Sequence, residues 1–253
     1  MKKNKTKDYF LPISIILAGL IIAGAVIYSN GLKIAKQKEL SSSLTPAKTN
    51  FKELNLLPDD PVLGDKNAPL TLFEFSNYQC PYCGRFHQLT RPEIVKNYVE
   101  KGKVKMVFRD FPFHQYAQKA AEATWCAKEQ GKYWEMQDFL FLQAQKSSES
   151  FSLENLLKYA KDLKLDPLQY SNCLNSGKYS ERVNQSAKEA QSLGIGGTPT
   201  IIIAKKLPLK IDPEEVKTAR GQGNYVINLD GGVMIIGAQA YLVFQTEIDK
   251  LLQ

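Results

Sequence analysis

The chain has 253 residues, four cysteines and a net charge of +7. This charge does not indicate a nucleic-acid-binding protein, because nine lysines against three acidic residues place +6 of it in residues 1–58 and leave +1 for the rest. The part after residue 58 is long enough for one domain with its own hydrophobic core, and it contains no internal repeat.

The chain begins with a lysine-rich segment, followed by an uncharged run over residues 10–28. As a helix, this run would extend about 28 Å, close to the roughly 30 Å thickness of a membrane's hydrocarbon core. By the positive-inside rule, the four lysines in residues 1–9 predict a cytoplasmic tail and an exported remainder. We therefore expect an uncleaved membrane anchor, with a signal peptide cleaved near residues 23–25 as the alternative.

Residues 29–58 are predicted to form a linker, because they are rich in serine and lysine and show little hydrophobic periodicity. The predicted domain then covers residues 59–253. An exported domain permits its cysteines to oxidise, and four cysteines allow three pairings in principle.

A predicted strand over residues 70–76 leads into a Cys-Pro-Tyr-Cys segment. A predicted helix over residues 85–101 and a predicted strand over residues 104–108 follow. Cys80 therefore falls at the start of the helix, and Pro81 at an early position where proline is favoured.

The position of Cys80 at a helix N-terminus indicates redox chemistry, because unpaired N–H groups and about half a positive charge favour a thiolate there. We expect Cys80 to be the exposed nucleophile and Cys83, one turn into the helix, to be the shielded resolving thiol. A purely structural disulfide is the alternative. A zinc site is disfavoured, because only His87 and His114 could add to the two cysteines.

Glu74 lies in the predicted strand, six residues before Cys80. A carboxylate in a central strand would be buried at a considerable cost in free energy. Either Glu74 is solvated at an edge, or it is the proton acceptor for the buried thiol.

Residues 193–203 end a predicted helix with glycines and then open a β-branched strand. Thr198 and Pro199 lie at the entry to this strand, where proline is tolerated because it need not donate to the ladder. Taken alone, the segment is a turn between a helix and a strand.

These motifs, in this order, are similar to those of the DsbA family within the thioredoxin superfamily, over about residues 59–253. The matching segments are Phe73-Glu74-Phe75, Cys80-Pro81-Tyr82-Cys83, Phe108-Arg109-Asp110-Phe111-Pro112, residues 130–135 and Gly197-Thr198-Pro199-Thr200. The resemblance implies an α/β, thioredoxin-like fold with an inserted helical domain. Residues 114–193, which show no strand pattern, fit that insert.

The resemblance also implies roles for single residues. Pro199 is expected to be cis and to face the cysteine pair, while the backbone of Thr198 binds an extended substrate segment. Glu74 is supported as the buried acid. Between the cysteines, Pro81 and Tyr82 tune the redox poise, and Tyr82 lacks the charge of the histidine found there in strongly oxidising members.

Cys126 and Cys173 both fall within the expected helical insert. The simplest pairing leaves Cys80 with Cys83 and joins Cys126 to Cys173, and the alternative is two unrelated buried thiols. A disulfide closing this loop would stabilise the fold by about 4 kcal/mol in the chain-entropy model.

The sequence departs from the family pattern after the Thr-Pro strand. The usual short hairpin is expanded by the polar residues 205–224, which precede a hairpin with an Asp230-Gly231 turn. The expansion either alters the substrate groove or decorates an edge of the domain.

The sequence and the resemblance together predict a membrane-tethered, extracytoplasmic thiol–disulfide oxidoreductase of bacterial type that needs no cofactor. Its expected partners are exported proteins with free thiols and a quinone-linked membrane partner that reoxidises Cys80 and Cys83. The alternatives are a reductase or isomerase of the same fold, a non-catalytic peptide-binding module and a metal-handling domain.

Overall fold

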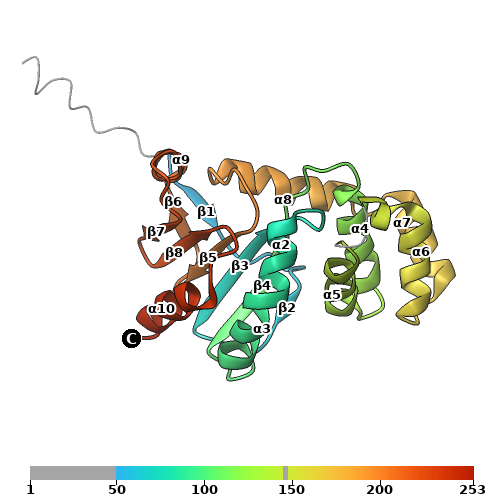
Figure 1. Ribbon diagram of the computed structural model, residues 1–253, viewed down its shortest axis with the longest axis horizontal. Coiled ribbons are helices and arrows are strands. Elements are labelled where there is room, and N and C mark those ends of the chain that lie inside the picture. The colour runs from blue at the N-terminus through green and yellow to red at the C-terminus, as the bar shows by residue number, and fades with distance from the viewer. Residues whose placement is uncertain (1–49, 145–147) are drawn as a thin grey trace, which may run out of the picture. The chain divides into compact units, whose positions relative to one another are not determined.

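The computed structural model describes residues 50–144 and 148–253 (Figure 1). The predicted tail at 1–9, the predicted anchor at 10–28 and most of the predicted linker lie outside these residues. Within the described part, no helix has both the length and the hydropathy needed to cross a bilayer.

A six-stranded sheet forms the centre of the domain, in the order β2-β4-β3-β5-β8-β7. From one edge to the other, its strands are β2 (Val62–Leu63), β4 (Val104–Asp110), β3 (Leu70–Ser76), β5 (Thr200–Ala204), β8 (Gly232–Ile236) and β7 (Val226–Leu229). β3 runs parallel to β4 and antiparallel to β5. Every residue of β3 is buried, which explains why its sequence is a nearly continuous apolar run.

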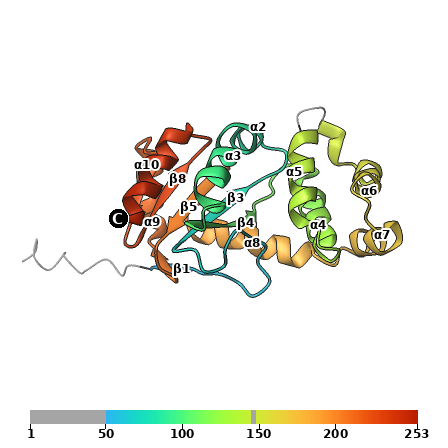
Figure 2. The same cartoon turned by 90° about the horizontal axis from the view of Figure 1, so that it is seen from below.

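Helices cover both faces of this sheet, so the thioredoxin-like part has three layers (Figure 2). One face packs against the helical segment that follows Cys80 and against α10 (Tyr241–Leu252), through Phe86 and Phe244 among others. The opposite face packs against α8 (Ser180–Ser192) through Ala190. The predicted α/β, thioredoxin-like fold is thus confirmed.

The helical segment after Cys80 is divided into turns of different width. It comprises α2 (Pro81–Arg85), η1 (Phe86–Thr90), α3 (Arg91–Ile94) and η2 (Val95–Val99), of which η1 and η2 have wide π-type turns. Pro92 lies within the segment and lacks the N–H that would complete a regular α-helical ladder, which favours such widening. The helical segment begins at Pro81, which agrees with the placement of Cys80 at the helix start, although the predicted range began only at residue 85.

The predicted helical insert is present, and its hydrophobic core, which includes Trp125, Met136 and Leu156, continues into Tyr78 and Phe108 of the thioredoxin-like part. Its helices are α4 (Ala117–Lys128), α5 (Tyr133–Gln143), η3 (Ser148–Phe151), α6 (Leu153–Asp162) and α7 (Pro167–Ser176). The insert lies beside the sheet, and α8 leads from it back to the thioredoxin-like part (Figures 1 and 2).

The domain begins earlier than residue 59, so the predicted linker boundary at residue 58 is wrong. β1 (Lys52–Leu54) pairs with β6 (Leu209–Ile211), and Leu54 is fully buried. A three-residue strand has too little periodicity to be recognised locally, and its partner lies far along the chain. Asp60 adds a second attachment, because its carboxylate contacts Arg109 of β4 at 2.7 Å.

The expanded segment after β5 folds into regular structure. β6 is followed by α9 (Pro213–Gly221), whose N-cap residue Asp212 accepts a hydrogen bond from the backbone N–H of Glu214 at 2.9 Å. Val216 of α9 is fully buried in the core on the α8 side of the sheet. β7 and β8 then form the predicted hairpin, and Gly231 in its turn has a φ of +90°.

Candidate active site

Cys80 is the N-cap residue of α2, and Pro81 is the first residue of this helix. The backbone of β3 ends four residues earlier, so the strand and the helix together fix the Cys80 sulfur beyond the carboxyl end of this central strand. The two cysteines are free thiols in this structure. Cys80 is 6% exposed and Cys83 is fully buried.

Cys80 is more buried than the sequence led us to expect. Its residual exposure is toward a surface pocket of about 440 Å³, lined by Gln79, Pro81, Arg85 and Gln88 among others. The asymmetry between the two cysteines is nevertheless the predicted one, since Cys83 does not line this pocket. Tyr82 is 58% exposed beside them, and the guanidinium of Arg85 lies 5.3 Å from its ring centre.

The environment strongly favours a thiolate on Cys80. A hydrogen bond from the Cys83 thiol lowers the pKa of Cys80 from 9.0 to about 5, with help from the hydroxyl of Thr198 and the backbone N–H groups of Cys83 and Tyr82, although partial burial opposes the shift. Burial and the neighbouring Cys80 raise the pKa of Cys83 well above its ordinary value. One sulfur is therefore ready to ionise at neutral pH, and the other is held as a thiol.

The Thr198–Pro199 peptide bond is cis and lies directly against Cys80. The Sγ of protonated Cys80 donates a hydrogen bond to the carbonyl oxygen of Thr198 at 3.3 Å, although the residues are 118 positions apart. Two further hydrogen bonds fix the loop: Thr200 Oγ1 donates to the Gly197 carbonyl at 2.8 Å, and the N–H of Gly237 donates to the Pro199 carbonyl at 2.8 Å.

The hydroxyl of Thr198 is buried and, among the described residues, has no hydrogen-bond acceptor. It is therefore available to donate to a thiolate on the cysteine pair, which is how it lowers the pKa of Cys80. Ser76 acts in the same direction on Cys83. Sequence reasoning missed Ser76, whose only signal is that it lies two residues after Glu74, on the same face of β3.

Glu74 lies in the centre of the sheet and is 2% exposed, so the solvated-edge alternative is wrong. Its Oε1 lies 3.4 Å from Nε2 of His87 in η1. The imidazole of His87 is stacked on the ring of Phe141, 3.7 Å between ring centres, and its Nδ1 lies 3.9 Å from the half-exposed carboxylate of Asp138. Burial lowers the pKa of His87, although the Glu74 carboxylate opposes this.

His87 was considered from the sequence only as a zinc ligand, and the structure gives it a different neighbour. The described residues contain no group of three or more metal-binding side chains. The partner of His87 is instead the buried acid, a pairing that only the packing of the helical segment on β3 brings about.

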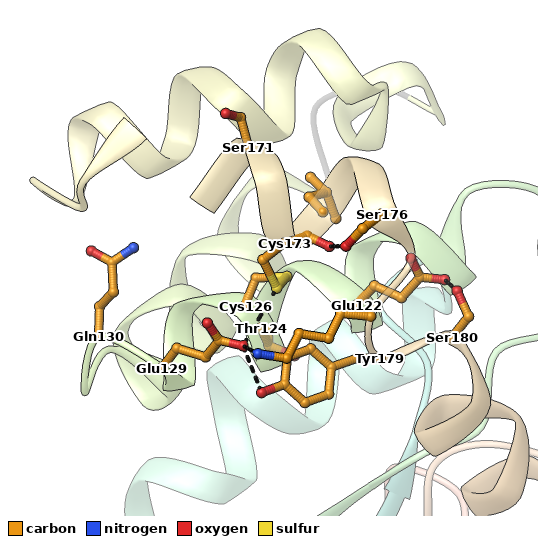
Figure 3. Close-up of a disulfide and its surroundings, with 12 residues drawn as sticks. Glu122, Thr124, Cys126, Glu129, Gln130, Ser171, Cys173, Ser176, Tyr179 and Ser180 are labelled. Atoms are coloured by element: carbon orange, nitrogen blue, oxygen red, sulfur yellow. Dashed lines mark hydrogen bonds and ion pairs between the residues drawn. A yellow bond between two sulfur atoms is a disulfide. The ribbon is translucent and has the colours of Figure 1, made fainter. Parts of the chain in front are cut away.

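Cys126 of α4 and Cys173 of α7 form a disulfide within the insert (Figure 3). Beside it, the carboxylate of Glu129 accepts a hydrogen bond from the hydroxyl of Tyr179 at 2.9 Å and pairs with Lys178 at 2.6 Å. Cys80 and Cys83 are therefore the two cysteines that remain available for thiol–disulfide exchange.

A family model described as thioredoxin matches residues 57–219. The chain is 30% identical to a disulfide bond formation protein D of Bacillus subtilis, over 62% of this chain and 73% of that protein. It is also 34% identical to a Na(+)/H(+) antiporter, NhaA 3, of Salinispora tropica, over 58% of this chain. The chain spans only 22% of the length of that antiporter, so the match does not extend to the whole of it.

Among solved structures, the crystal structure of α-DsbA1 of Wolbachia pipientis superposes with a TM-score of 0.65 at 26% identity. The superposition covers 79% of this chain and 94% of that one. Both the thioredoxin-like part and the helical insert are thus features that this chain shares with a known protein.

Proposed function

The chain belongs to the thioredoxin family as a DsbA-like thiol–disulfide oxidoreductase, and on that premise we propose that Cys80 and Cys83 introduce disulfides into exported proteins. The observation that carries this proposal is the contrast between the two thiols. Cys80 has a pKa of about 5 at a helix N-terminus, whereas Cys83 beside it stays protonated.

The low pKa of Cys80 favours an oxidase over a reductase. A stabilised thiolate stabilises the reduced form of the pair, so the oxidised form accepts electrons more readily. The pKa near 5 is lower than the value of about 7 typical of the reductant thioredoxin. A reductase would need the reduced pair to be the less stable form.

The proposed cycle starts with a disulfide between Cys80 and Cys83. A substrate thiolate attacks the Cys80 sulfur, and Cys83 leaves as a thiolate that takes up a proton. A second substrate thiolate then attacks the substrate sulfur of the mixed disulfide and releases Cys80 as a thiolate. Two electrons pass from the substrate to the pair, and the substrate leaves with a new disulfide.

Glu74 and Thr198 have separate roles in this proposal. Glu74, buried in β3 on the same strand face as Ser76, exchanges the proton of Cys83 in this proposal. The backbone of Thr198, next to the Cys80 sulfur, pairs with an extended segment of the substrate.

The proposed location is the outer side of the cytoplasmic membrane, with residues 10–28 as a single-pass anchor and the N-terminus inside. The lysines before this run and its uncharged length support the topology. A quinone-linked membrane protein is the proposed oxidant of the reduced pair. Protease treatment of intact spheroplasts should degrade the domain but leave the first residues protected, and protection of the domain would contradict the topology.

The decisive experiment measures the reduction potential of the Cys80–Cys83 pair in glutathione buffers. We expect a value closer to about −120 mV than to about −270 mV, the values of a strong oxidant and of a reductant. The oxidised chain should also oxidise a reduced dithiol peptide, and Cys80→Ala should abolish this. A strongly reducing potential would favour the reductase, and an unreactive Cys80 in the wild type would favour a binding module.

A further inference from the structure

The segment that departs from the family pattern packs directly on the loop that carries Thr198 and Pro199. Arg220, in the last turn of α9, donates from a guanidinium N–H to the carbonyl oxygen of Gly194 at 3.1 Å. At the other end of α9, a β-carbon on Gly194 would lie only 2.7 Å from the carbonyl oxygen of Pro213. Both ends of this helix therefore contact the start of the loop.

Gly196 shows how closely Arg220 approaches this loop. A β-carbon built on Gly196 would overlap the guanidinium of Arg220. The φ of Gly196 lies outside the left-handed region, so its backbone could be adopted by other residues. A side chain at this position would therefore meet the flexible guanidinium of Arg220, which would have to move aside, and no backbone atom.

Arg220 also carries a charge without an acidic partner. Within the described part of the chain, no carboxylate forms an ion pair with Arg220, whereas nearby Lys217 pairs with Glu214 at 2.6 Å. Arg220 and Lys217 line a surface pocket of about 540 Å³ together with Asn224, Tyr225 and Gln239, and no acidic residue contributes to this lining. The site therefore suits an anionic group.

A second set of residues that line the pocket lies next to the loop that carries Thr198 and Pro199. Ile236 and Gln239, which line it, flank Gly237, whose N–H binds the carbonyl of Pro199 at 2.8 Å. Gly196 and Thr198 are two residues apart, which is about 7 Å in an extended chain. A substrate segment paired with Thr198 therefore passes within a few residues' length of the Arg220 guanidinium.

We propose that α9 extends the substrate-binding surface beyond the cis-proline loop, and that Arg220 binds a carboxylate located within about three residues of the reacting cysteine in the substrate. This inference rests on the proposed oxidase function and adds a preference for acidic thiol substrates. It assigns the expanded segment to the substrate groove rather than to the decoration of an edge.

The test compares pairs of dithiol peptides that differ only in one residue, glutamate or glutamine, placed one to three positions from a cysteine on either side. The readout is the ratio of the two rates of oxidation by the full-length oxidised chain. We expect the best-placed glutamate to be favoured about two- to fivefold, the range for partly exposed ion pairs. The ratio should fall as salt is added, because exposed charges are screened.

Two variants test the residues. Arg220→Gln should bring the ratio close to one. Gly196→Ala should also lower it, because the new methyl group displaces the guanidinium while the charge remains. Lys210→Gln is the matched control: it removes an exposed lysine of β6 that does not line the pocket, and it should leave the ratio unchanged.

The outcomes separate this inference from the function on which it rests. If the wild type oxidises the glutamine peptides but shows no preference at any position, the inference is wrong and the oxidase function stands. The same conclusion follows if Arg220→Gln slows both peptides equally, because Arg220 then only supports the loop. If the wild type oxidises neither peptide, the oxidase function itself fails.

Discussion

The sulfur of Cys80 lies 3.3 Å from the carbonyl oxygen of Thr198, a residue 118 positions away in the sequence. This contact joins the helix N-terminus, which ionises the sulfur, to the loop on which a substrate would be bound. The buried hydroxyl of the same Thr198 lies within reach of the thiolate. One residue therefore contacts the reactive atom through its backbone and lowers the pKa of that atom through its side chain.

Replacing Thr198 with valine should raise the pKa of Cys80 from about 5. Valine keeps the shape of the side chain but cannot donate a hydrogen bond to the thiolate, a bond typically worth about 1.5–3 kcal/mol when one partner is charged. Since the sulfur is partly solvated, we expect a rise of about one pH unit. Thiolate absorbance against pH measures the shift. Tyr82→Phe is the control, and a pKa as low as that of the wild type in Thr198→Val would rule out the hydroxyl as a donor.

The stability of the reduced protein should rise with pH because of Cys80. The pKa of Cys80 is lowered from 9.0 when unfolded to about 5 when folded, so between these values the unfolded chain binds more protons. The contribution of Cys80 to the free energy of unfolding is complete above about pH 9 and is lost as the pH falls through about 5. The slope should stay below the limit of about 1.4 kcal/mol per pH unit, because solvent screens the sulfur.

The measurement is the difference in unfolding free energy between the reduced wild type and Cys80→Ser, from urea titrations at pH 5 to 8. Taking this difference removes the effects of other shifted groups, among them His87, whose pKa is lowered, and Asp110, whose pKa is raised to about 6. A difference that is flat across this range would show that the folded pKa of Cys80 is not depressed.

Replacing Glu74 with glutamine should slow the step in which Cys83 attacks a mixed disulfide on Cys80. Cys83 must lose its proton for this attack, and its own pKa is raised by burial. Loss of a positioned proton acceptor should slow the step by about a hundredfold. Rapid-quench trapping of the mixed disulfide gives the rate. In the control variant Glu247→Gln, at another buried glutamate in α10, the mixed disulfide should decay at the wild-type rate. Equal decay rates in the two variants would exclude Glu74 as the acceptor.

Replacing Arg109 with methionine should destabilise the domain by about 3 kcal/mol, because the buried carboxylate of Asp60 would keep only Arg182, at 3.0 Å, and Glu189 would lose its contact with Arg109. Arg109 also donates to the backbone carbonyl of Asn55 at 2.8 Å, which ties the segment before residue 59 to β4. Urea unfolding provides the measurement. Lys103→Met, at an exposed position just before β4, should change stability by less than about 0.5 kcal/mol. If the two variants are equally stable, residues 50–60 contribute little to the domain.

Short-range sequence patterns were sufficient to predict the part of the site that lies around Cys80. A strand, a Cys-Pro-Tyr-Cys segment and a helix follow one another without a gap, so the helix N-terminus and its effect on the sulfur can be read from adjacent residues. The same applies to the Asp230-Gly231 hairpin, whose two strands are joined by adjacent residues.

Long-range contacts were not accessible in this way. The register of β1 on β6, the pairing of Asp60 with Arg109, the contact of His87 with Glu74 and the packing of Arg220 on Gly196 each join segments with no shared local pattern. Residues 205–224 looked like polar loop because α9 is short and mostly exposed on its outer face.

By itself, the amino-acid sequence determined which sulfur would lie at the helix N-terminus and which would lie one turn into the helix, because a helix N-terminus is a local property of consecutive residues. Only the tertiary structure decided what faces that sulfur and how far the surrounding surface extends. Those features depend on the packing of α9, β8 and the cis-proline loop. These segments are distant in the sequence and come into contact only when the sheet forms.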